Sequence, residues 1–204
     1  ELSKFDASTA VTVGAHSSIG MRGLLLFGTE EQKAKYYPKL ATGEMIAAFC
    51  LTEPGSGSDA ASVKTRAERD GDDWILNGEK LWITNGGIAD FFTVFAKTGG
   101  SEDRKKLSAF IVTRDLGGVS HGPHEDKMGI RASSTTTVTF ENVRVTAANL
   151  LGEEGKGFKV AMNILNSGRT GIGGGSVGVM KKMIELSSKQ AKERVQFGKP
   201  IAEY

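Results

Sequence analysis

The residues best suited to bind a ligand lie in a loop that follows a short apolar segment. Residues 46–51 are apolar enough for a buried strand, and Thr52, Ser56 and Ser58 then offer hydroxyls separated by glycines. Glycine lets the main chain approach a ligand closely, and hydroxyls with backbone amides can replace the water that a phosphate or a heterocyclic carbonyl loses. The loop therefore suits an anionic or polar ligand, although its composition is also typical of a plain surface loop.

A second candidate segment, Leu81 to Gly87 with the sequence LWITNGG, follows a predicted hairpin closed by Asn77-Gly78. Trp82 taken alone is typical of a core aromatic.

The remaining residues with reactive side chains have simpler structural explanations. His16 lies among small residues in a helical segment, which favours a packed or hydrogen-bonded histidine over a catalytic one. His121 and His124 flank Gly122-Pro123, which indicates a turn, and because no fourth ligand is evident we expect no metal site. Cys50 lies in the predicted buried strand and is interpreted as a small hydrophobe; as the single cysteine, it can form no disulfide within the chain.

The first 45 residues are predicted to be helical. Thr29 stands three residues before Gln32, which is a helix-start signal, and the helix that begins there is expected to kink or end near Pro38.

The next hundred residues are predicted to form a β domain. Short alternating or apolar runs are separated by turn residues from residue 47 to about residue 150. The expected strands cover residues 74–76, 91–96, 107–112, 136–140 and 143–145, with turns at 70–73 and 98–101 and a solvated loop at 102–106.

From Gly155 onward the pattern is helical again. The glycine-rich segment 171–180, GIGGGSVGVM, follows a helical rather than a strand-like segment, so it does not fit a dinucleotide-binding turn. Its small residues are expected to permit close helix packing.

Composition indicates an ordinary globular protein of one or two domains: of 204 residues, 39% are hydrophobic and 25% charged. The net charge of +2 provides no broad basic field for nucleic acid. No apolar run approaches the roughly 20 residues that span a bilayer, and no secretory signal opens the sequence. The sequence begins without methionine and ends at Tyr204, which we interpret as a fragment.

The segments TEPGSGSD, from Thr52, and NGEKLWITNGG, from Asn77, strongly resemble the flavin-binding motifs of the acyl-CoA dehydrogenases. The resemblance covers essentially the whole chain and is strongest to the very-long-chain branch. It implies an α+β fold with the end of an N-terminal helical domain (1–46), a middle antiparallel β domain (47–154) and the truncated start of a C-terminal helical domain (155–204).

The resemblance also implies the site residues. FAD would be held by Phe49, Leu51, Thr52, Gly57, Ser58, Trp82, Ile83 and Thr84, with Thr84 near the flavin N5. Arg194, Gln196 and Phe197 would reach the FAD of a neighbouring subunit, which implies a homodimer or homotetramer. The acyl-CoA substrate would contact Ser58, Asn166 and Arg169.

The implied activity is FAD-dependent α,β-dehydrogenation of a fatty acyl-CoA, of long chain, with electron-transfer flavoprotein as electron acceptor. In some relatives the catalytic base precedes the arginine that matches Arg169, but here that residue is Gly168, so the expected glutamate lies beyond Tyr204. The implied location is mitochondrial in a eukaryote, in the matrix or associated with the inner membrane, and cytoplasmic in a bacterium. Two alternatives stay open: a scaffold or assembly protein that keeps the dehydrogenase fold, and an acyl-CoA oxidase that passes electrons to oxygen.

Overall fold

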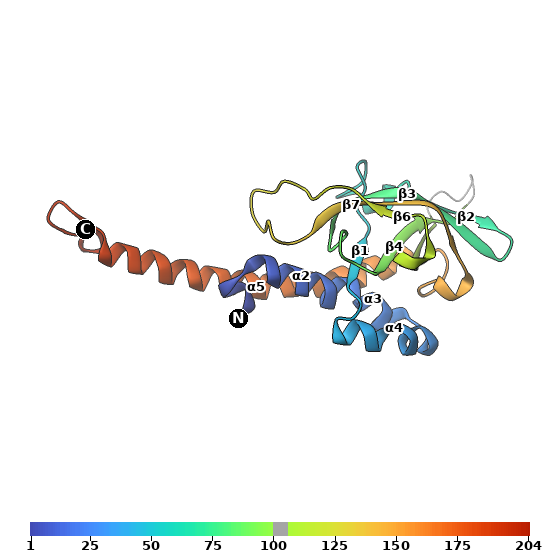
Figure 1. Ribbon diagram of the computed structural model, residues 1–204, viewed down its shortest axis with the longest axis horizontal. Coiled ribbons are helices and arrows are strands. Elements are labelled where there is room, and N and C mark those ends of the chain that lie inside the picture. The colour runs from blue at the N-terminus through green and yellow to red at the C-terminus, as the bar shows by residue number, and fades with distance from the viewer. Residues whose placement is uncertain (100–105) are drawn as a thin grey trace.

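The first part of the chain forms short helices, of which the earliest lie along the long C-terminal helix and the later ones lie beside a β-sheet (Figure 1). The computed structural model describes residues 1–99 and 106–204. The early helices are α1 (Leu2–Phe5), α2 (Ala7–Gly14), the π-helical turn η1 (Ala15–Gly20), α3 (Arg22–Phe27) and α4 (Glu30–Thr42).

Helix α4 starts where the sequence predicts but does not end there. The Thr29 hydroxyl accepts from the Gln32 amide at 3.2 Å, and the Gln32 side chain accepts from the Thr29 amide at 3.0 Å, which confirms the helix start. The expected end near Pro38 is wrong, because the helix continues to Thr42 and stops at Gly43, whose φ is 77°. Proline removes one N–H donor, but Leu40, two residues later on the same helix, is buried, which favours continuing the helix past Pro38.

The sheet contains seven described strands in the order β1-β4-β2-β3-β7-β6, with β5 paired to β4. Four of its pairings are antiparallel, whereas β1 with β4 and the single-residue contact of β2 with β4 are parallel. The strands are β1 (Ala47–Cys50), β2 (Arg66–Asp70), β3 (Asp73–Thr84), β4 (Phe91–Lys97), β5 (Leu107–Thr113), β6 (Val119–His121) and β7 (Thr135–Val145). The predicted antiparallel β domain is therefore mainly antiparallel, and the strands expected at 136–140 and 143–145 are one continuous strand.

The hairpin predicted at Asn77-Gly78 is wrong. Strand β3 runs through both residues, and its hairpin with β2 closes within the turn predicted at 70–73. Gly78 instead marks a register shift with φ of 156°, where an added Cβ would lie 2.7 Å from the Cβ of Thr65. The turn and loop expected between residues 98 and 106 lie largely outside the described residues.

Strands β4 and β5 are buried on both faces, so their side chains contribute to two separate apolar cores. Phe92, Val94 and Phe110 pack inside the sheet with Trp74 and Phe140. The second core joins the opposite face to the helices and contains Leu24, Leu40, Phe91, Phe95, Ile111, Leu151, Val160 and Ile164. This second core fixes the helices against the sheet.

His16 and Cys50 have the structural roles that the sequence predicts. The His16 Nδ1 accepts from the Ala47 amide at 3.0 Å, and its Nε2 lies 2.9 Å from the Leu40 carbonyl oxygen, so both ring nitrogens are paired. Cys50 is fully buried, and this burial raises the pKa of its thiol to about 12. The thiol is therefore protonated and inert at neutral pH.

The last helix, α5 (Gly157–Glu193), passes without interruption through the glycine-rich segment 171–180 and extends well beyond the sheet (Figure 1). An added Cβ on Gly168 would lie 2.6 Å from Cγ2 of Ile19, and the Ser3 hydroxyl donates to the Gly175 carbonyl at 2.8 Å. Small residues thus permit close helix packing at these positions. A small hairpin of β8 (Val195–Gln196) and β9 (Lys199–Pro200) follows at the far end.

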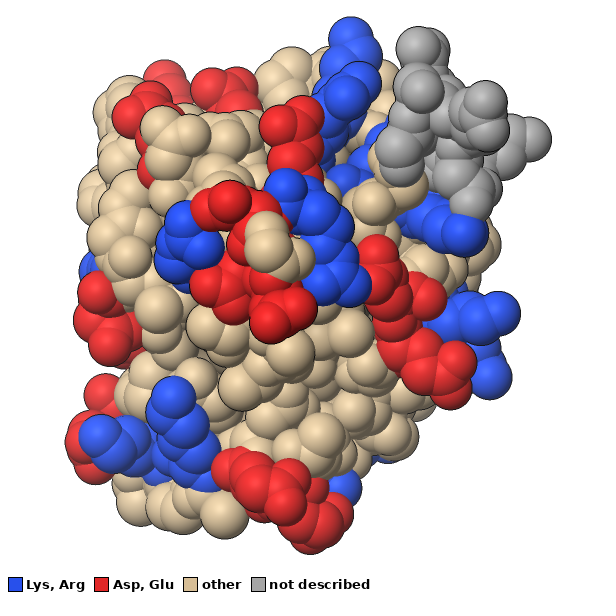
Figure 2. All heavy atoms as spheres, turned by 90° about the vertical axis from the view of Figure 1, so that its right-hand side faces the viewer, with Lys and Arg blue, Asp and Glu red and all other residues tan. Residues whose placement is uncertain are grey.

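Charged side chains of both signs are mixed over the face at the sheet end of the molecule, so neither sign forms a continuous field there (Figure 2). Among the described residues, no helix has both the length and the apolar character needed to cross a membrane.

We predict that Gly20→Ala destabilises the protein by about 1–3 kcal/mol, because the new methyl group would lie 2.7 Å from the Ala47 Cβ and 2.9 Å from its carbonyl carbon, where the backbone cannot yield easily. Gly14→Ala is the matched control, since Gly14 has helical φ of −63° and no atom within 4 Å of the added Cβ. It should stabilise the protein by up to about 1 kcal/mol. Urea unfolding of both variants checks the sign of each change.

Candidate functional site

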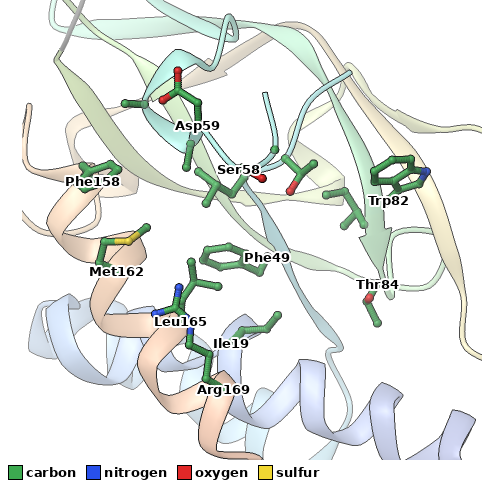
Figure 3. Close-up of a pocket in the computed structure, with 16 residues that line it drawn as sticks. Ile19, Phe49, Ser58, Asp59, Trp82, Thr84, Phe158, Met162, Leu165 and Arg169 are labelled. Atoms are coloured by element: carbon green, nitrogen blue, oxygen red, sulfur yellow. The ribbon is translucent and has the colours of Figure 1, made fainter. Parts of the chain in front are cut away.

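A cavity of about 510 Å³ lies between the sheet and the first turns of α5 (Figure 3). Its walls come from η1, from β1 and the loop after it, from the end of β3, and from α5. The lining residues are Ile19, Phe49, Leu51, Thr52, Gly57, Ser58, Asp59, Ala60, Ala61, Trp82, Ile83, Thr84, Phe158, Met162, Leu165 and Arg169.

The structure brings together all eight residues that the two sequence motifs contribute to the predicted cofactor site. Phe49, Leu51, Thr52, Gly57, Ser58, Trp82, Ile83 and Thr84 all line the cavity. Their contact with a cofactor stays a prediction.

The other predicted site residues divide into two groups. Arg169 lines the cavity, and its Nη1 donates to Oδ1 of Asn166 at 3.3 Å, although Asn166 is not part of the lining. The group predicted to reach a neighbouring subunit, Arg194, Gln196 and Phe197, lines a separate hollow. This group belongs to the segment that follows α5, at the far end of the chain from the sheet (Figure 1).

Backbone hydrogen bonds hold the two motifs beside each other. The Leu81 amide donates to the Thr52 carbonyl oxygen at 2.8 Å and joins the start of the loop to β3. Within the loop, Glu53 and Ser56 exchange backbone bonds of 2.9 and 3.0 Å, and the Ser56 hydroxyl donates to the Asp59 carbonyl at 2.6 Å. The loop is therefore an ordered turn rather than a plain surface connection.

Strand β3 changes direction where it enters the cavity. Its pairing with β7 shifts register between Lys80 and Ile83, and Trp82 has φ of 56°. A non-glycine residue in this left-handed region is strained by roughly 1–2 kcal/mol. The irregular backbone leaves the Trp82 side chain 63% exposed at the cavity edge, on the same side of the cavity as Thr84 (Figure 3).

Asn85 fixes the turn that follows. It is fully buried with φ of 66°, and its Nδ2 donates to the carbonyl oxygens of Thr12 and Ala47 at 3.1 and 3.2 Å. The turn after Thr84 is thereby attached both to helix α2 and to β1.

Sequence reasoning missed several lining residues. The spacing of Phe158, Met162 and Leu165, four and three residues, places them on one apolar face of α5, but nothing in that pattern indicates a cavity. Asp59 directly follows Ser58, so the motif itself was a signal for it. Ile19 lies on a π-helical turn and had no sequence signal.

The arrangement suits a flat, largely apolar ligand that carries polar groups at its edges. Thr52, Ser58 and Thr84 contribute hydroxyls to the lining, and Arg169 supplies a guanidinium from α5 (Figure 3). In Figure 3 the Asp59 carboxylate points away from both Thr84 and Arg169. Within residues 1–99 and 106–204, no group of three or more His, Cys, Asp and Glu side chains could hold a metal ion.

Three family models match the chain in succession. They describe the acyl-CoA dehydrogenase N-terminal domain at residues 1–44, the middle domain at residues 48–143 and the C-terminal domain at residues 155–204.

Curated relatives and solved structures agree with these models. The chain is 54% identical over 203 residues to the mitochondrial very long-chain specific acyl-CoA dehydrogenase of Homo sapiens, covering 96% of this chain and 31% of that protein. It is 46% identical to an acyl-CoA dehydrogenase of Bacillus subtilis (strain 168), covering 99% and 53%. The chain thus spans about a third to a half of the length of these relatives.

Among solved structures, the acyl-CoA dehydrogenase of Bacillus anthracis complexed with FAD superposes with a TM-score of 0.91 at 52% identity, covering 97% of this chain and 33% of that one. Butyryl-CoA dehydrogenase of Megasphaera elsdenii gives a TM-score of 0.95 at 43% identity, covering 100% and 54%.

We expect Asn85→Gly to destabilise the protein by about 1–3 kcal/mol, because glycine keeps the left-handed backbone but removes two buried hydrogen bonds. Asn142→Gly is the matched control: Asn142 has φ of 51°, but its side chain is exposed. Thermal unfolding should show a clear loss only for Asn85→Gly, and equal losses would contradict the anchoring role of Asn85.

Proposed function

This chain belongs to the acyl-CoA dehydrogenase family, and we propose that the protein is an FAD-dependent enzyme that dehydrogenates a long-chain fatty acyl-CoA to the trans-2-enoyl-CoA. One observation carries the proposal: two motifs about thirty residues apart in sequence meet at one cavity. Similarity to a protein that is complexed with FAD supports the choice of cofactor.

The residues around the cavity fit a flavin by their chemistry. The hydroxyls of Thr52, Ser58 and Thr84 and the open space beside Gly57 match the polar edge of such a ring, while Phe49 offers apolar surface. Trp82 would cover one edge of the ring. Bound FAD would supply the hydride acceptor for the reaction.

The acyl-CoA substrate would lie against α5. Phe158, Met162 and Leu165 offer apolar contact for an acyl chain, and the Arg169 guanidinium suits a phosphate or carbonyl oxygen because its forked donors give charge-assisted hydrogen bonds. Asn166, which accepts from Arg169, would orient that guanidinium. Identity of 54% to a very long-chain specific enzyme supports the preference for long chains.

Removal of the substrate α-proton requires a base, and we place that base beyond Tyr204. Gly168 has no side chain to act as a base, and an added Cβ would lie 2.6 Å from the Ile19 Cγ2, which would then have to shift. Among the described residues that line the cavity, Asp59 is the single carboxylate, and it points away from Thr84 and Arg169 (Figure 3).

The electron acceptor would be electron-transfer flavoprotein, in line with a similar solved structure whose title names that protein from Acidaminococcus fermentans. Arg194, Gln196 and Phe197 would contact the FAD of a second subunit in a homodimer or homotetramer. Relatives named as mitochondrial support a mitochondrial location for a eukaryotic source, and the bacterial relatives support a cytoplasmic one for a bacterial source.

One observation favours a second candidate function. A prolyl acyl carrier protein oxidase superposes with a TM-score of 0.92 at 40% identity, so the same fold also occurs in an oxidase. Peroxide formation during aerobic turnover of palmitoyl-CoA would identify this alternative, whereas turnover that needs a dye or flavoprotein acceptor supports the dehydrogenase.

Thr84→Val should weaken FAD binding by about 0.5–1.5 kcal/mol or shift the flavin reduction potential without unfolding the protein, because it removes one hydroxyl from the cavity. Thr139→Val, on β7 and outside the lining, is the control. Titration of the apoprotein with FAD and spectroelectrochemistry measure both properties. An unchanged affinity and potential in Thr84→Val would contradict the assignment.

Asp59→Asn should keep kcat for palmitoyl-CoA within about tenfold of the wild-type value, because the proposed base lies elsewhere. Loss of a true general base removes roughly 10²–10⁴-fold of the rate. A loss of that size in Asp59→Asn, with FAD still bound, would show that Asp59 is the base and that our placement is wrong.

A further inference from the structure

A buried ion pair lies directly behind the cavity wall. Lys80 on β3 is fully buried, and its Nζ donates to Glu53 Oε1 at 2.7 Å, to the Phe95 carbonyl at 2.7 Å and to the Leu51 carbonyl at 3.3 Å. An ammonium group has three donors, so all of them are used. The lysine thereby connects β3, β4 and the last residue before the ligand-binding loop.

The partner carboxylate closes that loop at both ends. Glu53 is only 5% exposed and stands at the second position of the motif TEPGSGSD. Its Oε1 accepts from the Thr65 amide at 3.0 Å and from the Thr65 hydroxyl at 2.6 Å, and its Oε2 accepts from the Lys64 amide. One side chain therefore joins the entry of the loop, at Glu53, to its exit, at Lys64 and Thr65.

These contacts satisfy the pair without any contribution from a ligand. Burial opposes ionisation of Glu53, yet the Lys80 charge and the donors of Thr65 and Lys64 together hold the pKa of Glu53 below its ordinary value. Neither side chain lines the cavity, although Leu51 and Thr52 do. Two charges are thus kept out of water beside the site, and replacing such a pair by neutral residues is often harmless to stability.

We propose that Glu53 and Lys80 are positioning residues, which place the Thr52–Ser58 loop against the Trp82–Thr84 strand end and so set how tightly the flavin is held. The inference rests on the proposed function. Lys80 precedes Trp82 by two residues and Glu53 follows Thr52 directly, so each charge is attached to one of the two motifs that meet at the cavity. Loss of the pair removes the side-chain links between the loop and the strand end and leaves the Leu81 to Thr52 backbone bond in place.

A purely structural pair would affect flavin binding only through global stability, and two variants separate the possibilities. Glu53→Gln/Lys80→Met removes both charges at similar side-chain size, and its apoprotein should unfold within a few degrees of wild type. Glu53→Asp keeps the charge but shortens the reach by one methylene, so the carboxylate cannot contact Lys80 and the Lys64–Thr65 amides together. Both variants should bind FAD about tenfold or more weakly, as expected when one or two cofactor hydrogen bonds are misplaced.

Two comparison proteins complete the experiment. Glu30→Gln/Lys33→Met neutralises a matched lysine–glutamate pair of 3.0 Å on the surface of α4, and its FAD affinity should equal that of wild type. Val143→Ala removes buried volume from the core inside the sheet, away from the cavity lining, and lowers stability without touching the pair. It should keep FAD affinity within twofold of wild type.

The measurements are apoprotein titration with FAD, thermal unfolding of the apoprotein and the flavin reduction potential at saturating FAD, all on the full-length protein. Weaker FAD binding and a shifted potential in Glu53→Asp, with neither in Val143→Ala, support the inference. Wild-type FAD affinity in Glu53→Asp overturns the inference, as does an equal loss of FAD affinity in Val143→Ala. If the double variant does not fold, the result for Glu53→Asp alone decides between these outcomes. Failure of wild type itself to bind FAD would overturn the proposed function as well.

Discussion

Burial of β4 and β5 on both faces is the constraint on which the rest of the structure depends. A strand pair with no solvent-facing side needs an apolar layer against each of its two faces. Here the rest of the sheet curves over one face, and helices α3, α4 and α5 cover the other. The helical cover brings α5 and η1 close to the end of β1. The cavity lies where these elements meet, so its position follows from how the second core is closed.

The cavity is therefore bounded by two parts of the protein that pack through one shared core. Phe49 and Thr84 belong to the sheet side, whereas Ile19 and Met162 belong to the helical side. A ligand that contacts both sides binds only when they are docked, and its binding free energy adds to the stability of that docking. Ligand binding and the attachment of α5 to the sheet are in this way thermodynamically coupled, so a change that weakens one weakens the other.

Local sequence signals predicted the parts of the fold that depend on neighbouring residues. They failed where a contact between residues far apart in the sequence determines the local structure. The Thr29 capping box, the buried strand at residue 47 and the two motifs were readable because each pattern is completed within a few residues. Asn77-Gly78 has the composition of a hairpin turn, but here β3 continues through both residues. Glycine is favoured at position 78 because the Thr65 side chain occupies the space where a Cβ would lie. Likewise no pattern around Ile19 indicates that it meets Gly168 across 149 positions of sequence.

Gly168 illustrates how packing limits where chemistry can be placed. At the position just before Arg169, a Cβ would lie 2.6 Å from the Ile19 methyl group, so the close approach of α5 to η1 favours a residue without a side chain there. The same approach brings Arg169 to the cavity on the next position of the helix. A carboxylate at position 168 would therefore require the Ile19 side chain to shift, and Ile19 itself lines the cavity. The Arg169 guanidinium reaches the cavity without any such change, so in this packing the helix holds the cation there and no base one residue earlier.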